Sequence, residues 1–234
     1  MLYNAVRAGL EREGGLKMED VAGLVRDGFQ RALEPLAEVG RQVQGEFPSC
    51  SFLGTDASVA PGLDHTSITE TFGLILGGSN GFGGPGTLAA ASMITKGLKV
   101  SQRTSCSSSF LSVRLPPLYL SSCLKGVPLA CGYSGLMLPV CEDVGLAEAY
   151  SQGKLTMSEL LSYSSVCGVG LDTVPIAGSA AETEAVVQGI LMDVCGLAQK
   201  WDKMLSCRLL PCPNKSDGDR TDFKSPYLVD CILR

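Results

Sequence analysis

The chain of 234 residues carries 24 acidic and 19 basic side chains, for a net charge of −5, and 45% of its residues are hydrophobic against 18% that are charged. This composition is typical of a globular protein and excludes an intrinsically disordered one. No cluster of lysines and arginines stands out, which argues against a nucleic-acid partner. A chain of this length can bury a sizeable core, and we expect a single α/β domain over residues 1–234.

Ten cysteines are spread along the chain at irregular spacing, several of them in apolar runs. The first ten residues lack the uninterrupted apolar core of a signal peptide, so we expect a cytosolic protein with free thiols rather than a disulfide framework. No Cys-x-x-Cys pair occurs and His65 is the lone histidine, so the pattern predicts no metal site. No motif identifies a cofactor, and no membrane partner is expected.

The N-terminal part is expected to form a long helix followed by loops. Over residues 19–44 apolar residues recur at three- and four-residue steps, which predicts an amphipathic helix that Pro35 ends or kinks. A short β-like run begins at Cys50 and breaks into a loop that carries Asp56 and Asp64. These two carboxylates are candidate ligand-binding residues because such a pair can hold a cation, with turn formation as the more common alternative.

The next helix is marked by its ends. Ser67 and Glu70 have the spacing of a capping box, which predicts a helix from Ile68 to just before Gly77. His65 directly precedes this helix, in the context DHTS. Any cysteine–histidine pair must use it, so His65 is a candidate ligand-binding residue, with capping at the surface as the alternative.

The segment GGSNGFGGPGTLAAASMITKGLK predicts a glycine-rich loop that feeds a helix. Gly86 and Thr87 are expected in the first helical turn, where free amide groups can hold an anion. Gly84, Gly86 and Thr87 are therefore candidate ligand-binding residues. The spacing matches neither the Walker loop nor the dinucleotide fingerprint, and a plain loop that permits close packing is favoured.

Residues 100–125 differ from the rest, because they are rich in serine, contain no acidic residue and sustain no period. Without them the chain would read GLK-GVPLACGYSG, an ordinary connection between a helix and a strand. We interpret the segment as an insertion that is irregular or disordered.

Helices and short strands alternate after this segment. Residues 127–141 are expected to form a buried strand that continues into a loop, and residues 142–152 a helix. Thr156 with Glu159 has capping-box spacing and opens another short helix.

A third such pair, Ser179 with Glu182, opens a helix of about five turns. Two strand candidates follow, SCRLLPCP and PYLVDCIL, with a polar loop between them. This alternation predicts an α/β fold with at least a partly parallel sheet.

The stretch VCGVGLDTVPIAG, residues 166–178, concentrates glycines around one cysteine and one aspartate. It is expected to be a strand that ends at Val166, turns through Gly168 and Gly170, and enters a loop held by Pro175. Ligand sites in α/β sheets gather at the carboxyl ends of strands, where such a loop would lie.

Cys167 and Asp172 are therefore the candidate catalytic residues. A thiol near backbone amides can act as a nucleophile, and the carboxylate can orient a ligand hydroxyl or a metal-bound water. Gly168, Gly170 and Thr173 are candidate ligand-binding residues of the same loop. In the alternative interpretation Cys167 is one more small buried residue and Asp172 caps a turn through its own backbone.

Four segments in this order carry a family resemblance: GTDASVAP from Gly54, FGGPGTLAAA from Phe82, GYSGLMLPV from Gly132 and VCGVGLDTVPIAG from Val166. Together they resemble the C-terminal portion of the uncharacterised domain-of-unknown-function family seven hundred eleven, whose fold is similar to that of pyruvate formate-lyase and other glycyl-radical enzymes. The resemblance implies a partial barrel-like α/β fold that lacks the N-terminal portion of the family. It does not imply radical chemistry, because the last glycine, Gly218, lies in a polar loop and not in an Arg-Val-x-Gly-Tyr context.

Two functions stay open at this point. The first is a cytosolic metabolic enzyme or small-ligand-binding protein with a glycine-rich loop site around Cys167 and Asp172. The second is a truncated, non-catalytic fragment or subunit whose surface packs against a partner, which includes a second copy in a homo-oligomer. Loops that converge on one cleft favour the first, and an uncovered apolar face favours the second.

Overall fold

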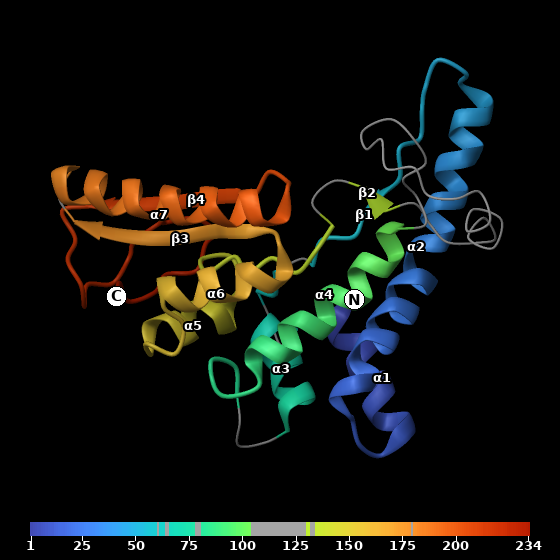
Figure 1. Ribbon diagram of the computed structural model, residues 1–234, viewed down its shortest axis with the longest axis horizontal. Helices are drawn as coiled ribbons and strands as arrows, with labels where there is room; N and C mark the ends of the chain where they lie inside the picture. The colour runs from blue at the N-terminus through green and yellow to red at the C-terminus, as the bar shows by residue number, and fades with distance from the viewer. Residues whose placement is uncertain (60, 64–65, 78–80, 104–129, 132–133, 179) are drawn as a thin grey trace.

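The computed structural model describes residues 1–59, 61–63, 66–77, 81–103, 130–131, 134–178 and 180–234 (Figure 1). These residues form a mixed α/β fold that is mostly helical, so the predicted α/β class is confirmed. The described strands pair as two separate two-stranded parallel sheets, β1–β2 and β3–β4, and the described residues form no barrel. Among the helices of these ranges, none has the length and apolar character needed to cross a membrane.

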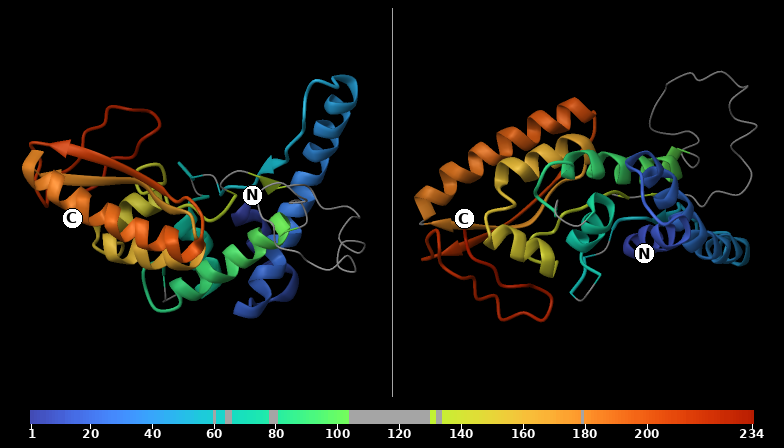
Figure 2. Two further views of the ribbon diagram at one scale, coloured as in Figure 1. Left: turned by 45° about the horizontal axis from the view of Figure 1, so that its top comes forward. Right: turned by 90° about the horizontal axis from the view of Figure 1, so that it is seen from below.

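In chain order the elements are α1 (Leu2–Glu13), the 3-10 helix η1 (Met18–Asp20), α2 (Val21–Glu46), β1 (Thr55–Asp56), α3 (Ile68–Leu76), α4 (Thr87–Arg103), β2 (Ala130–Cys131), α5 (Val144–Ser151), α6 (Met157–Cys167), β3 (Gly170–Gly178), α7 (Ala180–Trp201) and β4 (Ser206–Pro213). The helices α1 to α4 gather at one end of the molecule, and α7 lies with β3 and β4 at the other end (Figures 1 and 2).

The N-terminal part is built around α2, which contacts α1 and α4. This helix was predicted, but it does not end at Pro35. Its buried residues repeat at every fourth position: Val21, Val25, Phe29, Leu33 and Ala37. Leu36 and Val43 were expected in the apolar stripe but are exposed, because only this one row faces the neighbouring helices. At Gly97 of α4 a Cβ atom would lie 2.6 Å from the carbonyl oxygen of Ala22, so the glycine permits the close contact with α2.

The predicted helix at Ile68 is confirmed as α3, but its predicted capping box is wrong. The Ser67 hydroxyl lies 2.7 Å from the Thr69 hydroxyl and does not cap the helix. The N–H of Ile68 instead donates to the carboxylate of Asp143, at 3.0 Å. A side chain 75 residues further along the chain thus satisfies the helix terminus.

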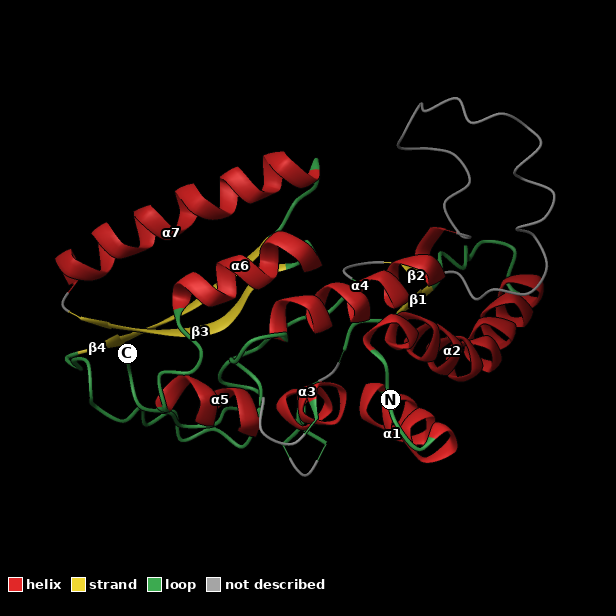
Figure 3. Ribbon diagram, turned by 60° about the horizontal axis from the view of Figure 1, so that its bottom comes forward, coloured by secondary structure: helices red, strands yellow, loops and turns green. Residues whose placement is uncertain are grey.

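The C-terminal part contains the β3–β4 pair, with α6 and α7 packed along β3 (Figure 3). The strands pair from Gly170 opposite Ser206 to Gly178 opposite Pro213, with one shift of register between Leu171 and Val174. β4 is the predicted strand SCRLLPCP, and the helix α7 was also predicted, although Ser179 of its proposed capping box lies outside the described residues. The capping box at Thr156 is confirmed and starts α6.

Two strand predictions are wrong. The run from Cys50 has no strand before Thr55, and the segment PYLVDCIL contributes only a single bridge, between Arg220 and Ile232. This C-terminal segment uses its N–H groups elsewhere, since Ile232 donates to the Ser151 hydroxyl at 2.9 Å. Of the proposed insertion, residues 100–103 belong to α4 and residues 104–125 lie outside the described residues.

Candidate functional site

The motif VCGVGLDTVPIAG leads from a helix into a strand, whereas a strand that ends at Val166 and then a loop were predicted. Cys167 is the last residue of α6, Gly168 ends the helix with a φ of 63°, and β3 begins at Gly170. Pro175, expected in a loop, lies within β3 opposite Leu210 of β4. The helix α6 extends into the motif. It starts at the Thr156 capping box and continues through its serine residues to Cys167.

Cys167 is 2% exposed, and burial raises the pKa of its thiol. Four groups act in the opposite direction without cancelling that effect: the N–H groups of Val169 and Gly170 and the charges of Lys99 and Lys203. At neutral pH this thiol is therefore protonated and out of contact with solvent, whereas an activated nucleophile is an accessible thiolate. The catalytic role of Cys167 stays a prediction.

The turn after Cys167 is shaped by close contacts. A Cβ atom at Gly168 would lie 3.1 Å from the ring of Trp201, the last residue of α7, and a Cβ at Gly170 would lie 2.1 Å from the carbonyl oxygen of Ser206. Lys99 packs over the same tryptophan, with its Nζ 3.8 Å from the ring centroid. Both glycines are thus required for helix and strand packing, which accounts for them without a ligand.

Asp172 lies at a bulge of β3. Leu171 pairs with Cys207 and Val174 with Leu209, so two residues of β3 stand opposite Arg208 alone. The Nε of Arg208 donates to Asp172, and its Nη2 donates to Oε1 of Glu142 at 3.1 Å. Asp172 is buried, while Arg208 is half exposed. The charge of the Asp172 carboxylate is therefore balanced by Arg208 of the neighbouring strand β4. Its proposed role in orienting a ligand stays a prediction.

Thr173, the second bulge residue, has a strained backbone. Its φ is 45°, a value that a β-branched residue adopts only under constraint. The residues before β3 explain the constraint, because Val140 and Cys141 donate to the carbonyls of Asp172 and Thr173, both at 3.1 Å. Within the described residues the buried Thr173 hydroxyl has no hydrogen-bond partner. A strained residue with an unsatisfied hydroxyl is a recognised mark of a functional position.

The glycine-rich loop before α4 satisfies its own polar groups. The Thr87 hydroxyl donates to the Gly84 carbonyl at 2.8 Å and accepts from the N–H of Gly83 at 3.1 Å. Gly86 has a φ of 97°, which suits glycine alone. Phe82 of the loop packs against Phe72, with ring centroids 5.1 Å apart. These contacts support the close-packing interpretation of the loop over the anion-site interpretation.

Asp56 lies at the end of β1 and lines a cavity of about 200 Å³. Hydroxyl groups share the wall, from Tyr3, Ser58, Thr66 and Thr71. The Asp56 carboxylate accepts from the N–H and the hydroxyl of Ser58, at 2.8 and 2.6 Å. None of the other predicted site residues within the described part lines this cavity, and Asp64 and His65 lie outside that part.

Asp143 is fully buried and was not among the predicted site residues. One carboxylate oxygen accepts from the N–H groups of Gly62 and Ile68, at 2.9 and 3.0 Å, and the other accepts from Leu146 at 3.0 Å. An aspartate directly before an apolar helix is a recognisable N-cap signal, so its role at α5 was readable. Its second role, at the distant α3, was not. Asp143 is a structural junction between the two parts of the molecule.

No group of three candidate metal ligands comes together among the residues that the structure places. Residues 122–224 match the family model described as "Uncharacterised ACR (DUF711)". The chain is also similar to UPF0210 proteins of Pyrobaculum aerophilum, at 32% identity over 81% of this chain, and of Syntrophobacter fumaroxidans, at 33% identity over 79%. The UPF0210 protein of Halothermothrix orenii is 27% identical over 94% of this chain.

The resemblance to this family is confirmed. The chain spans 37%, 35% and 43% of the length of these three relatives, respectively, so it corresponds to less than half of each. The names of these relatives give no activity, and the chemistry of the whole protein is a matter for proposal.

Proposed function

We propose that the chain is the C-terminal portion of a larger α/β protein of this family, and that it acts by packing against the remaining polypeptide without catalysing a reaction by itself. The outer face of α7 carries this proposal. Of the described side chains of this helix, only Ile190 and Val194 are buried, and Met192 is 70% exposed. A run of large apolar side chains at the surface, with few polar residues among them, is typical of an interface.

The chemistry of this face favours a protein surface as its occupant. Val186, Leu191 and Met192 are exposed large apolar side chains, and a groove of about 500 Å³ runs between α6 and α7. The acidic residue Asp193 lines this groove, and Glu184 lines a second hollow on α7 together with Leu191 and Met192. The occupant we propose is the part of the family protein that the chain does not span, presenting an apolar surface with basic residues at its rim.

The incomplete sheet supports the same conclusion. β3 and β4 form a two-stranded parallel pair, extended on the β3 side by the bridge from Pro139 to Asp172. Parallel sheets normally have more strands and are covered on both faces. We propose that the remaining polypeptide completes this sheet into the barrel-like arrangement of pyruvate formate-lyase-like proteins, in the cytosol and without glycyl-radical chemistry.

The test compares the isolated chain with a full-length relative. Hydroxyl-radical footprinting should oxidise Met192 rapidly in the isolated chain and should leave the outer side chains of the matching helix in the Pyrobaculum aerophilum protein protected by roughly tenfold. Aspartate at the position matching Met192 should destabilise the full-length relative by about 3 kcal/mol. At the position matching Met204, which is exposed outside α7, aspartate should change stability by less than about 0.5 kcal/mol. Equal reactivity of the two helices, or equal effects of the two substitutions, overturns the proposal.

A second function is favoured by the cavity at Asp56. A carboxylate beside several hydroxyl groups, at the carboxyl end of a parallel strand, suits a small amine or hydroxylated ligand. Ligand-observed NMR with a set of small amines tests it. Binding should be lost in Asp56→Asn and retained in Asp222→Asn, an exposed aspartate outside the cavity. The same binding by both variants rejects this site.

A further inference from the structure

Two buried thiols lie next to each other although 90 residues separate them in the chain. The Sγ atoms of Cys141 and Cys231 are 4.0 Å apart, and the residues are 0% and 1% exposed. A disulfide requires a sulfur–sulfur bond of about 2 Å between such facing side chains, so closing the pair takes a small side-chain rotation. Both cysteines are free in this structure.

The backbone holds the two cysteines in this relation from both sides. The carbonyl of Cys141 accepts from the N–H of Val229 at 2.7 Å, and Cys231 exchanges hydrogen bonds with Thr221, its N–H donating to the hydroxyl and its carbonyl accepting from the N–H, both at 2.9 Å. The chain end is tied down as well, since the Tyr150 hydroxyl donates to the carbonyl of Arg234 at 3.1 Å. The cysteine pair therefore lies where the C-terminal segment, residues 219–234, packs against residues 139–141, which extend the sheet beside β3.

We propose that Cys141 and Cys231 form a reversible thiol-oxidation site, at which a peroxide converts the pair into a disulfide that fastens the C-terminal segment to residues 139–141. This inference is independent of the proposed packing function. It concerns a face of the molecule formed by the chain itself, whereas the packing function concerns α7.

The two thiols have different roles in the reaction. Cys231 lies in a segment without helix or strand, which opens more easily than the strand extension that carries Cys141. The two Sγ atoms share a hydrogen bond in which either thiol can donate. With Cys141 as the donor, this hydrogen bond lowers the pKa of Cys231 and raises that of Cys141. When this segment opens, Cys231 becomes accessible and is the thiol that meets the oxidant, and Cys141 is the resolving thiol.

The chemistry balances with a peroxide as the oxidant. The Cys231 thiolate attacks one oxygen of hydrogen peroxide, the O–O bond breaks, and a sulfenic acid and hydroxide result. The Cys141 sulfur then attacks the Cys231 sulfur, the S–O bond breaks, and the leaving hydroxide takes up the proton of Cys141 as water. Two electrons pass from the two thiols to the peroxide. A dithiol such as dithiothreitol reverses the bond by exchange.

Cys212 serves as the control cysteine, because it could compete with Cys141 for a disulfide with Cys231. It is also buried, and its Sγ donates to the carbonyl of Leu210 at 3.5 Å, so it is engaged with its own strand. Cys195 on α7 and Cys50 are exposed and report how much oxidant is present. The reduced full-length chain is treated with hydrogen peroxide, alkylated and mapped without reduction by mass spectrometry.

The expected product is an intramolecular peptide pair joined through Cys141 and Cys231, at least about tenfold more abundant than any pair with Cys212. Cys141→Ser and Cys231→Ser should each abolish it, and Cys195→Ser and Cys212→Ser should retain it. Treatment in concentrated urea should remove the preference, which keeps the test valid if a serine variant does not fold. The proposal is overturned if Cys50 and Cys195 are fully oxidised while Cys141 and Cys231 can still be alkylated, or if Cys231 pairs with Cys212.

Discussion

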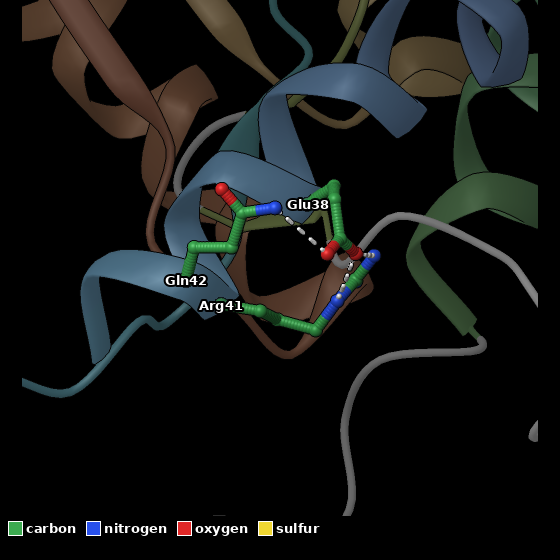
Figure 4. A network of polar contacts seen from close by, with 3 residues as sticks. All are labelled: Glu38, Arg41 and Gln42. Atoms are coloured by element: carbon green, nitrogen blue, oxygen red, sulfur yellow. Dashed lines mark hydrogen bonds and ion pairs between the residues drawn. The ribbon is translucent and has the colours of Figure 1, made fainter. Parts of the chain in front are cut away.

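The helices α2 and α7, of 26 and 22 residues, are packed in contrasting ways. α2 buries one row of side chains against α1 and α4 and turns a polar network to solvent. In that network Glu38 accepts from Arg41 at 2.8 and 3.2 Å and from Gln42 at 3.2 Å (Figure 4). α7 buries Ile190 and Val194 and turns Leu191 and Met192 outward. One helix has a surface suited to water, and the other has a surface suited to protein.

The sequences of the two exposed faces explain the contrast. α2 also exposes apolar residues, since Leu36, Val39 and Val43 lie on one face, but the Glu38–Arg41–Gln42 network lies on the same helix turns. From residue 185 to residue 197, α7 carries only two polar side chains, Gln188 and Asp193. Exposed apolar residues beside a polar network are normal on a monomer, whereas an apolar run with few polar neighbours is typical of an interface. A single exposed apolar residue therefore does not indicate an interface, whereas the polarity of the residues around it does.

The largest effect on stability is expected on the buried side of α2. Phe29→Ala removes a fully packed ring between helices, and we expect a loss of about 3–5 kcal/mol in the free energy of unfolding. Ile190→Ala on α7 removes a smaller side chain from a helix with fewer packed neighbours, and we expect about 2 kcal/mol. Urea unfolding followed by circular dichroism measures both. Equal losses would mean that α7 is anchored as firmly as α2.

A smaller effect is expected at the junction between the two parts. Asp143→Ala removes the acceptor of three backbone N–H groups that remain buried, which should cost about 2–3 kcal/mol. Asp143→Asn keeps one acceptor oxygen and should lose less. The single tryptophan, Trp201, reports on the C-terminal part by fluorescence, and circular dichroism reports on all helices. A variant as stable as the parent would show that solvent replaces the carboxylate at both helix ends.

The sequence predicted those features whose causes are local. The capping box at Thr156, the apolar run of α7 and the strand at residues 206–213 are each encoded within a few neighbouring residues. The cap of α3 was missed because its acceptor, Asp143, lies in another part of the chain. The strand predicted up to Val166 is the end of α6, and the loop predicted after it is β3, because a short apolar run does not separate helix from strand.

The candidate site was predictable only as a set of loops. Glycine positions with close neighbours, such as Gly170, were identified correctly as special, but the sequence could not say whether a ligand or a strand approached them. The bulge that pairs Asp172 with Arg208 depends on register between β3 and β4, and register follows from tertiary packing.

The smallest effects on stability are expected on the solvent-facing sides of α2 and α7, and they test the contrast between the two helices most directly. Glu38→Gln on α2 should leave the urea midpoint unchanged, because the network is fully solvated. Hydrogen bonds from Arg41 and Gln42 lower the pKa of Glu38. Any contribution of this carboxylate to the free energy of unfolding is therefore present above the usual carboxyl pKa and is lost as the pH falls through the lowered pKa. Met192→Ser on α7 should also change stability by less than about 0.5 kcal/mol, since the side chain is already in water.

What should separate these two variants is the binding of a hydrophobic fluorescent dye by the isolated chain. Met192→Ser removes the most exposed apolar side chain of α7 and should lower dye fluorescence, while Glu38→Gln should not change it. Because neither substitution alters the folded core, the dye signal then reports the surface alone. Equal dye binding by both variants would mean that the outer face of α7 is not the apolar surface that the chain presents, and the contrast between the two helices would lose its functional meaning.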